Sequence, residues 1–403
     1  MRKFICTGRK LPICELRMLL CLLALVVMVS TSLASEGTFP SWNYQQTGIT
    51  AYGGSGLLTA IAMRDGRTWP VIFTEDSARR VQAYSLYPVK NPVTLTNWFQ
   101  IGTNLITDTG SGMLSAATSS DGRFGVALTI VGSSNSAAVV GGSLTGFGGA
   151  MTGVQAIDFD RNGNLVQGTL NTLPVIQGVS PGPLVDIAVS ALGDVGAVDA
   201  NFKYYQNSPL MGGWGSQDLK QVVTTVSPPI AQSLDLSIDS LGRPHVLGVR
   251  TSTQELVSYD FDPVLGQWKT QSLGTGLVGY FGASVAADGK GGVGAAWIKY
   301  TQTGGVQLMY SYKSGENDWS TQLVTSSAYD PTTKIYSTLT QEQEVGLAFD
   351  ANDLPVISFT AGNKIWLAYD PSTVPEPSVM LLLVSGGVLV LLTRLKKRMS
   401  GKV

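Results

Sequence analysis

Short runs of alternating apolar and polar residues recur through the middle of the chain, from about residue 41 to residue 369. Alternation with a period of two predicts β-strands that bury one face. Two successive units repeat the same order, with runs inside residues 233–249, 255–261 and 267–273, and again inside 283–287, 294–300, 306–312 and 318–324. The pattern therefore predicts units of four short antiparallel strands.

A turn that contains Asp or Gly joins the first two runs of each unit. Six such turns occur, at Asp65-Gly66, Asp121-Gly122, Gly193-Asp194, Asp239/Gly242, Asp288-Gly289 and Asp350/Asp353. Four strands in about 45–60 residues are typical of one propeller blade, and the body resembles a β-propeller repeat protein. We predict an all-β fold, a propeller of about six four-stranded blades over residues 35–373. The stretch Val154–Gly163 looks like a further turn but aligns better within the second unit, so seven blades remain an alternative.

The last unit lacks its fourth run, because the alternation stops at Tyr369. The segment Ser41–Thr47 resembles the fourth run of the preceding unit, residues 318–324. We therefore predict that this N-terminal strand completes the last blade and removes an exposed sheet edge. The Gly- and Ser-rich residues 133–153 are expected to form a long loop within the second unit.

The first 34 residues have the organisation of a secretory signal peptide. A basic segment is followed by the apolar run Met18–Val29 and by Ser32-Leu33-Ala34, a small-x-small cleavage site. We expect cleavage after Ala34, which would send the body out of the cytoplasm.

The last 30 residues, 374–403, combine a proline-rich start, an apolar run and a basic end. Ser378–Thr393 is uncharged, and as a helix it would be about 24 Å long. The cations after it are costly to move into lipid and stay on the cytoplasmic side. We predict a transmembrane helix at 378–393, stopped by the basic residues Arg394, Lys396, Lys397 and Arg398.

The order of these parts resembles the PEP-CTERM sorting signal of exported proteins from Gram-negative bacteria. Pro375, Glu376 and Pro377 match its motif. The resemblance implies delivery by the secretion machinery and cleavage near the motif by an exosortase, a membrane protease. It places the body in the cell envelope or at the cell surface and implies little about what the body does.

Composition narrows the chemistry. All three cysteines, Cys6, Cys14 and Cys21, lie in the predicted signal peptide, so we expect a mature chain without disulfides. Residues 35–374 carry 17 Lys and Arg against 26 Asp and Glu, a net charge of −9. An acidic body disfavours nucleic acid as a partner.

The turn aspartates favour a structural interpretation, because Asp accepts backbone N–H bonds beside a glycine. One stretch allows a metal. Asp158, Asp160, Asn162 and Asn164 offer oxygen ligands at alternate positions, as at the start of a calcium loop. The twelfth position is Thr169 rather than Glu, so a plain Asn-Gly turn competes with calcium, and no other cofactor is expected.

His245 is the sole histidine, which excludes a multi-histidine metal centre within one chain. No G-x-S-x-G motif accompanies it, and we expect a structural role on a second strand. Four tryptophans recur near fourth strands and either pack between blades or stack on sugar rings; they are Trp98, Trp214, Trp268 and Trp319.

No catalytic residue can be assigned from these patterns. We expect an exported, surface-sorted, non-enzymatic propeller that binds a polysaccharide or a protein partner. A carbohydrate-active hydrolase or lyase that uses carboxylates in the propeller channel is an alternative. A structural envelope component is a second.

Overall fold

The computed structural model describes residues 42–52, 59–64, 67, 69–77, 81–86, 98–102, 112–118, 124–130, 136–141, 154–159, 165–171, 184–190, 195–199, 203–208, 213–218, 234–250, 255–275, 282–301, 303–315, 318–330, 335–339 and 343–370. The predicted signal peptide with Ala34, and the predicted sorting and membrane segment at 374–403, lie outside these residues. Within the described residues, no helix has the length and apolar character needed to cross a membrane.

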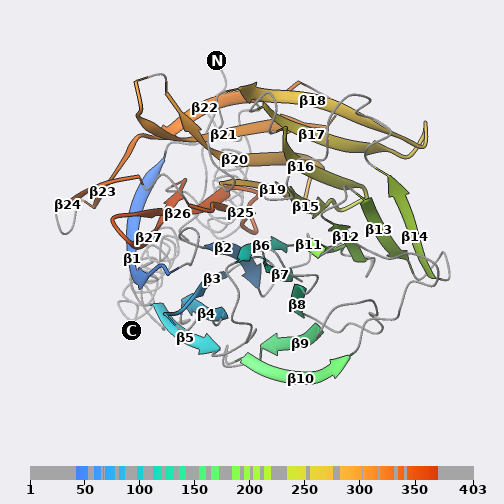
Figure 1. The fold of residues 1–403 in the computed structure, drawn as a ribbon, viewed down its shortest axis with the longest axis horizontal. Coiled ribbons are helices and arrows are strands. Elements are labelled where there is room, and N and C mark those ends of the chain that lie inside the picture. Colours follow the sequence, from blue (N-terminus) through green and yellow to red (C-terminus); the bar gives the residue numbers. More distant parts are fainter. Residues whose placement is uncertain are drawn as a thin grey trace, which may run out of the picture. The chain divides into compact units, whose positions relative to one another are not determined.

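Strands are the regular elements of the described residues, and Figure 1 shows how they gather into sheets. The sheet β2-β3-β4-β5 consists of Ala60–Arg64, Trp69–Glu75, Val81–Leu86 and Trp98–Gly102. The sheet β6 to β10 consists of Gly112–Thr118, Phe124–Ile130, Ser136–Gly141, Val154–Phe159 and Leu165–Asn171. The sheet β11 to β14 consists of Leu184–Val189, Val195–Asp199, Lys203–Ser208 and Gly213–Asp218.

The remaining sheets come from the C-terminal half and from the first strand. The sheet β15 to β18 consists of Leu234–Ile238, Pro244–Arg250, Glu255–Asp262 and Gln267–Thr275. The sheet β19 to β22 consists of Ala283–Ala287, Gly292–Tyr300, Val306–Ser314 and Ser320–Thr325. The sheet β25-β26-β27-β1 consists of Gly346–Phe349, Pro355–Ala361, Lys364–Tyr369 and Asn43–Thr50, and a small hairpin, β23-β24, of Ser327–Asp330 and Ile335–Thr338.

The first strands of the larger sheets contact one another in a closed series. β2 contacts β6, β6 contacts β11, and the series continues through β15, β19 and β25 back to β2. Successive sheets therefore surround a common centre formed by their first strands (Figure 1). The predicted all-β fold with a propeller-like arrangement is confirmed.

Side chains link these inner strands where the backbone would otherwise lack partners. Asp186 Oδ2 accepts the N–H of Leu236 at 2.6 Å, one sheet further on. Asp235 Oδ2 accepts the N–H of Val285 at 2.5 Å in the same way. A buried N–H group without an acceptor is costly, so these carboxylates replace the hydrogen bonds that a continuous sheet would supply.

The first strand of the body closes the last sheet. β1 pairs antiparallel with β27, with Asn43 opposite Tyr369 and Gln46 opposite Trp366. Figure 1 shows the blue β1 beside the red β27. The prediction that the N-terminal strand completes the last unit is confirmed, and β27 is not an exposed edge.

The expected loop at residues 133–153 is wrong in part. Ser136–Gly141 forms β8, which pairs antiparallel with β7 and parallel with β9. The sheet consequently has five strands, and β9 and β10 belong to it, as the alignment of Val154–Gly163 within the second unit predicted. Small residues in β8 hide its strand pattern, because Ala and Gly carry little of the hydrophobic alternation.

Apolar side chains between neighbouring sheets form the core. Trp268 on β18 is nearly buried and meets Tyr204 on β13 edge to face, with ring centroids 5.4 Å apart. Leu247 and Leu256 belong to the same cluster as Trp297 of the following sheet. For Trp268, the interpretation that these tryptophans pack between sheets is confirmed.

Candidate functional site

A cavity of about 360 Å³ opens at one end of the sheet β15 to β18, beside the sheet β19 to β22. Polar and charged side chains dominate its lining. The first sheet contributes Arg243, His245, Asp260, Phe261, Asp262, Lys269, Thr270 and Gln271, and the second contributes Lys313 and Gly315.

The turn from β15 to β16 places Arg243 and His245 at this cavity. Asp239 Oδ1 accepts the N–H groups of Leu241 and Arg243 at 2.9 and 2.8 Å. Gly242 adopts a φ of 78°, a left-handed conformation that glycine takes without steric cost. The carboxylate thus replaces the missing backbone partners of a tight turn.

The same turn recurs twice more in the described residues. Asp288 Oδ1 accepts two N–H groups between β19 and β20, and Asp350 Oδ1 accepts two between β25 and β26, all at 2.7 or 2.8 Å. The structural interpretation of these three aspartates is confirmed. The other three predicted turn anchors, at Asp65, Asp121 and Asp194, lie outside the described residues.

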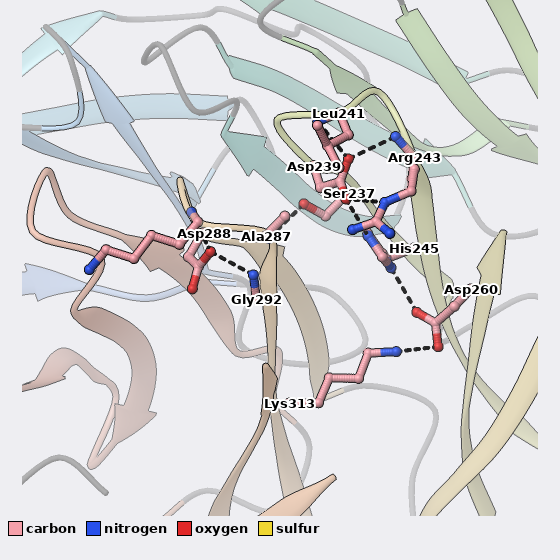
Figure 2. A network of polar contacts seen from close by, with 11 residues as sticks. Ser237, Asp239, Leu241, Arg243, His245, Asp260, Ala287, Asp288, Gly292 and Lys313 are labelled. Carbon is pink, nitrogen blue, oxygen red and sulfur yellow. Dashed lines mark hydrogen bonds and ion pairs between the residues drawn. The ribbon is translucent and has the colours of Figure 1, made fainter. Parts of the chain in front are cut away.

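The second oxygen of Asp239 faces charged groups. Arg243 Nε donates to Asp239 Oδ2 at 2.7 Å, and His245 Nε2 lies 3.5 Å from the same oxygen (Figure 2). Burial alone raises the pKa of Asp239, but the contacts with His245 and Arg243 outweigh it and lower the pKa overall. Asp239 is therefore a buried, ionised carboxylate that holds Arg243 and His245 in place.

His245 lies between two carboxylates. Its Nδ1 is 2.7 Å from Asp260 Oδ1, on the strand paired with its own. Burial lowers the pKa of His245, but its hydrogen bonds to Asp239 and Asp260 and the charges of both carboxylates raise the pKa above its ordinary value. Both ring nitrogens are thus engaged, and the imidazole is held as a donor rather than left available as a general base.

Asp260 connects the two sheets. Its Oδ2 accepts from Lys313 Nζ at 2.5 Å and from Ser258 Oγ at 3.2 Å. Burial raises the pKa of Asp260, but His245 and Lys313 lower it to about 2. A carboxyl group with that pKa stays ionised at neutral pH and does not serve as a proton donor.

Lys313 is fixed from a second side by an aromatic ring. Its Nζ lies 4.9 Å from the ring centroid of Trp319, a favourable position for a cation. Trp319 Nε1 donates to Ser258 Oγ at 3.1 Å, which returns the series of contacts to the first sheet. The ammonium group is therefore held in one place at the cavity wall.

Two turns beside the cavity carry exposed apolar side chains. Leu241, in the turn that holds Arg243, is 68% exposed. Val264 and Leu265, in the turn that follows Asp262, are 90% and 61% exposed. Polar groups in the hollow and apolar groups on the bordering turns suit a ligand that has both kinds of surface.

The remaining site residues predicted from the sequence are only partly placed. Asp158 lies on β9, whereas Asp160, Asn162 and Asn164 lie outside the described residues, so calcium binding there stays a prediction. No cluster of three metal-binding side chains occurs in the part of the chain that the structure describes. The sorting residues Pro375, Glu376 and Pro377 and the basic residues Arg394, Lys396, Lys397 and Arg398 also lie outside it.

His245 stands on a second strand, β16, as predicted, but it is the centre of the charged group rather than an isolated core residue. Sequence reasoning missed Asp260 and Lys313. The sequence does place Asp260 beside Ser258, because residues two apart on a strand share one face of the sheet. Lys313 follows Asp260 by 53 residues, and nothing local in the sequence joins them.

The fold and the cavity define an all-β, propeller-like protein with a polar site at an inter-sheet boundary. No protein-family model matches the sequence, and no curated protein matches it either. Solved structures of similar arrangement include AofleA from Arthrobotrys oligospora, with 12% identity, 84% of this chain and 88% of that chain covered, and a TM-score of 0.49.

Two lectins are also similar to this chain. A variant of the Aleuria aurantia lectin in complex with Fucα1-6GlcNAc has 13% identity, 82% and 100% coverage and a TM-score of 0.48. The BP39L lectin from Burkholderia pseudomallei has 13% identity, 78% and 98% coverage and a TM-score of 0.41. At this level of likeness the function of the chain has to be argued from its own site.

Proposed function

We propose that the protein binds a saccharide unit of a polysaccharide in the cavity beside His245, Asp260 and Lys313, and that it does not catalyse a reaction of this saccharide. The observation that carries this proposal is the lining itself. The cavity lining contains both hydrogen-bond donors and hydrogen-bond acceptors. Its volume of about 360 Å³ lies in the range of small-ligand sites.

A sugar ring matches that lining in two ways. Its hydroxyl groups both donate and accept, and they can meet Thr270, Gln271 and the charged side chains. Its C–H faces are apolar and can meet Phe261 in the lining or the apolar turns at the border. Both ring nitrogens of His245 and both carboxylate oxygens of Asp260 already contact protein groups, and this favours a role in binding.

The proposal extends to the whole chain. Six blades are proposed, one for each first strand in the closed inner series. Export by the signal peptide 1–34 and sorting by the PEP-CTERM-like tail would display the site at the cell envelope or surface, where polysaccharide is available. The support for export and sorting is the order of motifs in the sequence.

A glycan array tests the binding. The mature protein from its own cells should bind one group of saccharides, and Thr270→Trp should abolish that binding because an indole fills the cavity. Thr303→Trp, on an exposed turn outside the cavity lining, is the matched control and should bind as the wild type does. Absence of binding to any saccharide, or release of shortened products, would contradict the proposal.

Mass spectrometry of the same material tests the sorting. A new N-terminus at Ser35 and a C-terminus close to Pro375–Pro377 are expected. A cytoplasmic protein that retains residues 1–34 would contradict it.

A further inference from the structure

We propose that the saccharide taken by this cavity is acidic, and that the carboxylate of a uronic acid unit binds to Lys313, with Arg243 and Lys269 beside it. The inference rests on the proposed carbohydrate binding and specifies its ligand class. Arg243, Lys269 and Lys313 are the Lys and Arg side chains of the lining. Two of their carboxylate partners, Asp260 and Asp262, line the cavity with them, whereas the third, Asp239, does not.

Two of the three cations, Arg243 and Lys269, lie further out than the carboxylates that pair with them, whereas Lys313 is 6% exposed and its partner Asp260 is 13% exposed. The side chain of Arg243 is 21% exposed, whereas its partner Asp239 is 0% exposed. Lys269 is 50% exposed and its partner Asp262 is 13% exposed, with 2.9 Å between nitrogen and oxygen. A ligand that enters therefore meets the side chains of Arg243 and Lys269 first, and Lys313 lies deeper in the cavity.

The innermost pair leaves donors rather than acceptors for a ligand. Asp260 uses Oδ1 for His245 and Oδ2 for Lys313 and Ser258. Lys313 has three N–H groups, and among the described residues one acceptor, Asp260 Oδ2, is assigned to its ammonium. Lys313 lines the cavity, so an anionic oxygen of a ligand would complete the hydrogen bonds of its other N–H groups.

The acidic character of the body makes this local arrangement selective. Residues 35–374 carry a net charge of −9, so a polyanion is repelled by most of the surface. Binding of an acidic polymer would then depend on the cavity and not on a diffuse basic face. An acidic ligand bound at one cationic site also predicts that affinity falls as ionic strength rises.

The test compares polygalacturonate with the same polymer after its carboxyl groups have been reduced to alcohols. The mature protein from its own cells should bind polygalacturonate at least about tenfold more tightly than the reduced polymer, the range of one charge-assisted hydrogen bond. Lys313→Met should remove about tenfold of that affinity, and Lys269→Gln, an exposed change that leaves the core intact, about threefold. Lys290→Gln is the matched control, because Lys290 is 75% exposed and lies outside the cavity lining.

Each outcome decides a separate point. Equal affinity for native and reduced polymer overturns the acidic-ligand inference and leaves saccharide binding intact. Loss of binding in Lys290→Gln equal to that in Lys269→Gln also overturns it, because the attraction would then be general. Absence of binding to either polymer and to every neutral saccharide overturns the proposed function itself. If Lys313→Met fails to fold, Lys269→Gln and the reduced polymer still decide.

Discussion

Two neighbouring sheet boundaries use the same backbone frame for opposite chemistry. His245 follows the turn residue Asp239 by six positions and pairs with Asp260, and Gly294 follows Asp288 by six positions and pairs with Tyr312. At the first boundary these positions hold charges that reach Lys313 on the next sheet. At the second boundary a glycine and an aromatic ring stand in their place.

The second boundary is closed by a phenylalanine. A Cβ on Gly294 would lie 2.8 Å from Phe349 Cζ, so no side chain fits there without a shift. The rings of Tyr312 and Phe349 meet edge to face at 6.2 Å, and Tyr312 Oη donates to Asp288 Oδ2 at 2.7 Å. Burial and the nearby Asp288 raise the pKa of Tyr312, which therefore stays neutral. The two units share the same turn and the same strand pairing. The side chains at the two paired positions, His245 and Asp260 in one unit and Gly294 and Tyr312 in the other, decide whether the boundary is polar or apolar.

Removing Asp260 should have the largest effect. Asp260→Ala leaves His245 and Lys313 buried without their shared carboxylate and should lower the free energy of unfolding by about 3–5 kcal/mol. Urea denaturation of the purified variant measures it. Lys290→Ala, on an exposed turn, is the control and should change stability little. A loss below about 1 kcal/mol for Asp260→Ala would show that the charges contribute little to this boundary.

Filling the packed boundary should cost less. Gly294→Ala forces its new methyl group against Phe349 and should destabilise the protein by about 1–3 kcal/mol, the usual range for overpacking. Phe349→Leu in the same chain should recover part of that loss. A double-mutant cycle measures the coupling between the two sites. Additive losses would mean that the two residues do not oppose each other.

Neutralising the turn aspartates should separate the two roles of their oxygens. Asp239→Asn keeps the turn acceptor but loses its charge beside Arg243 and His245, and should cost about 1 kcal/mol. Asp350→Asn should change the free energy of unfolding little at pH 7. Burial raises the pKa of Asp350, so its negative charge contributes less to stability than that of Asp239. Thermal denaturation of both variants checks the order. Equal losses would contradict a special electrostatic role for Asp239.

The same contacts should also appear in the pH dependence of stability. The raised pKa of His245 contributes stability that is fully present below its ordinary value of 6.5 and is lost as pH rises through the folded-state pKa. Asp260, with its pKa of about 2, contributes stability above 3.8 that is lost as pH falls toward 2. The polar boundary should therefore be strongest between about pH 4 and 6.5.

One imidazole resonance reports this directly, since the chain has one histidine. Its NMR titration should give a pKa above 6.5, and Asp260→Asn should lower that pKa. A pKa of His245 at or below 6.5 in the wild type would contradict the stabilisation of the imidazolium by Asp239 and Asp260.

The features that the sequence predicted are those that short stretches encode. Period-two alternation marked the strands of residues 233–324, and Asp with a nearby Gly marked the turns at Asp239 and Asp288, because the carboxylate satisfies the turn's own backbone. The closing strand was predicted because residues 41–47 resemble the fourth strand of another unit. β8 was missed because its small residues carry little pattern.

The cavity was not predictable in the same way. It depends on Asp260 and Lys313, which belong to different units and meet only when two sheets pack. Charged residues on strands are common, and no spacing rule distinguishes a pair that meets across a boundary from one that faces solvent. The site therefore follows from packing, which sequence alone leaves open.

β27 has an additional mechanical consequence. It is hydrogen-bonded on one side to β26 and on the other to β1, and the chain continues from its end toward the residues after Tyr369. A pull on those residues loads two antiparallel ladders in shear at once, rather than peeling a single strand from a rim. A tether attached after Tyr369 would therefore pull on a strand that is hydrogen-bonded along both edges.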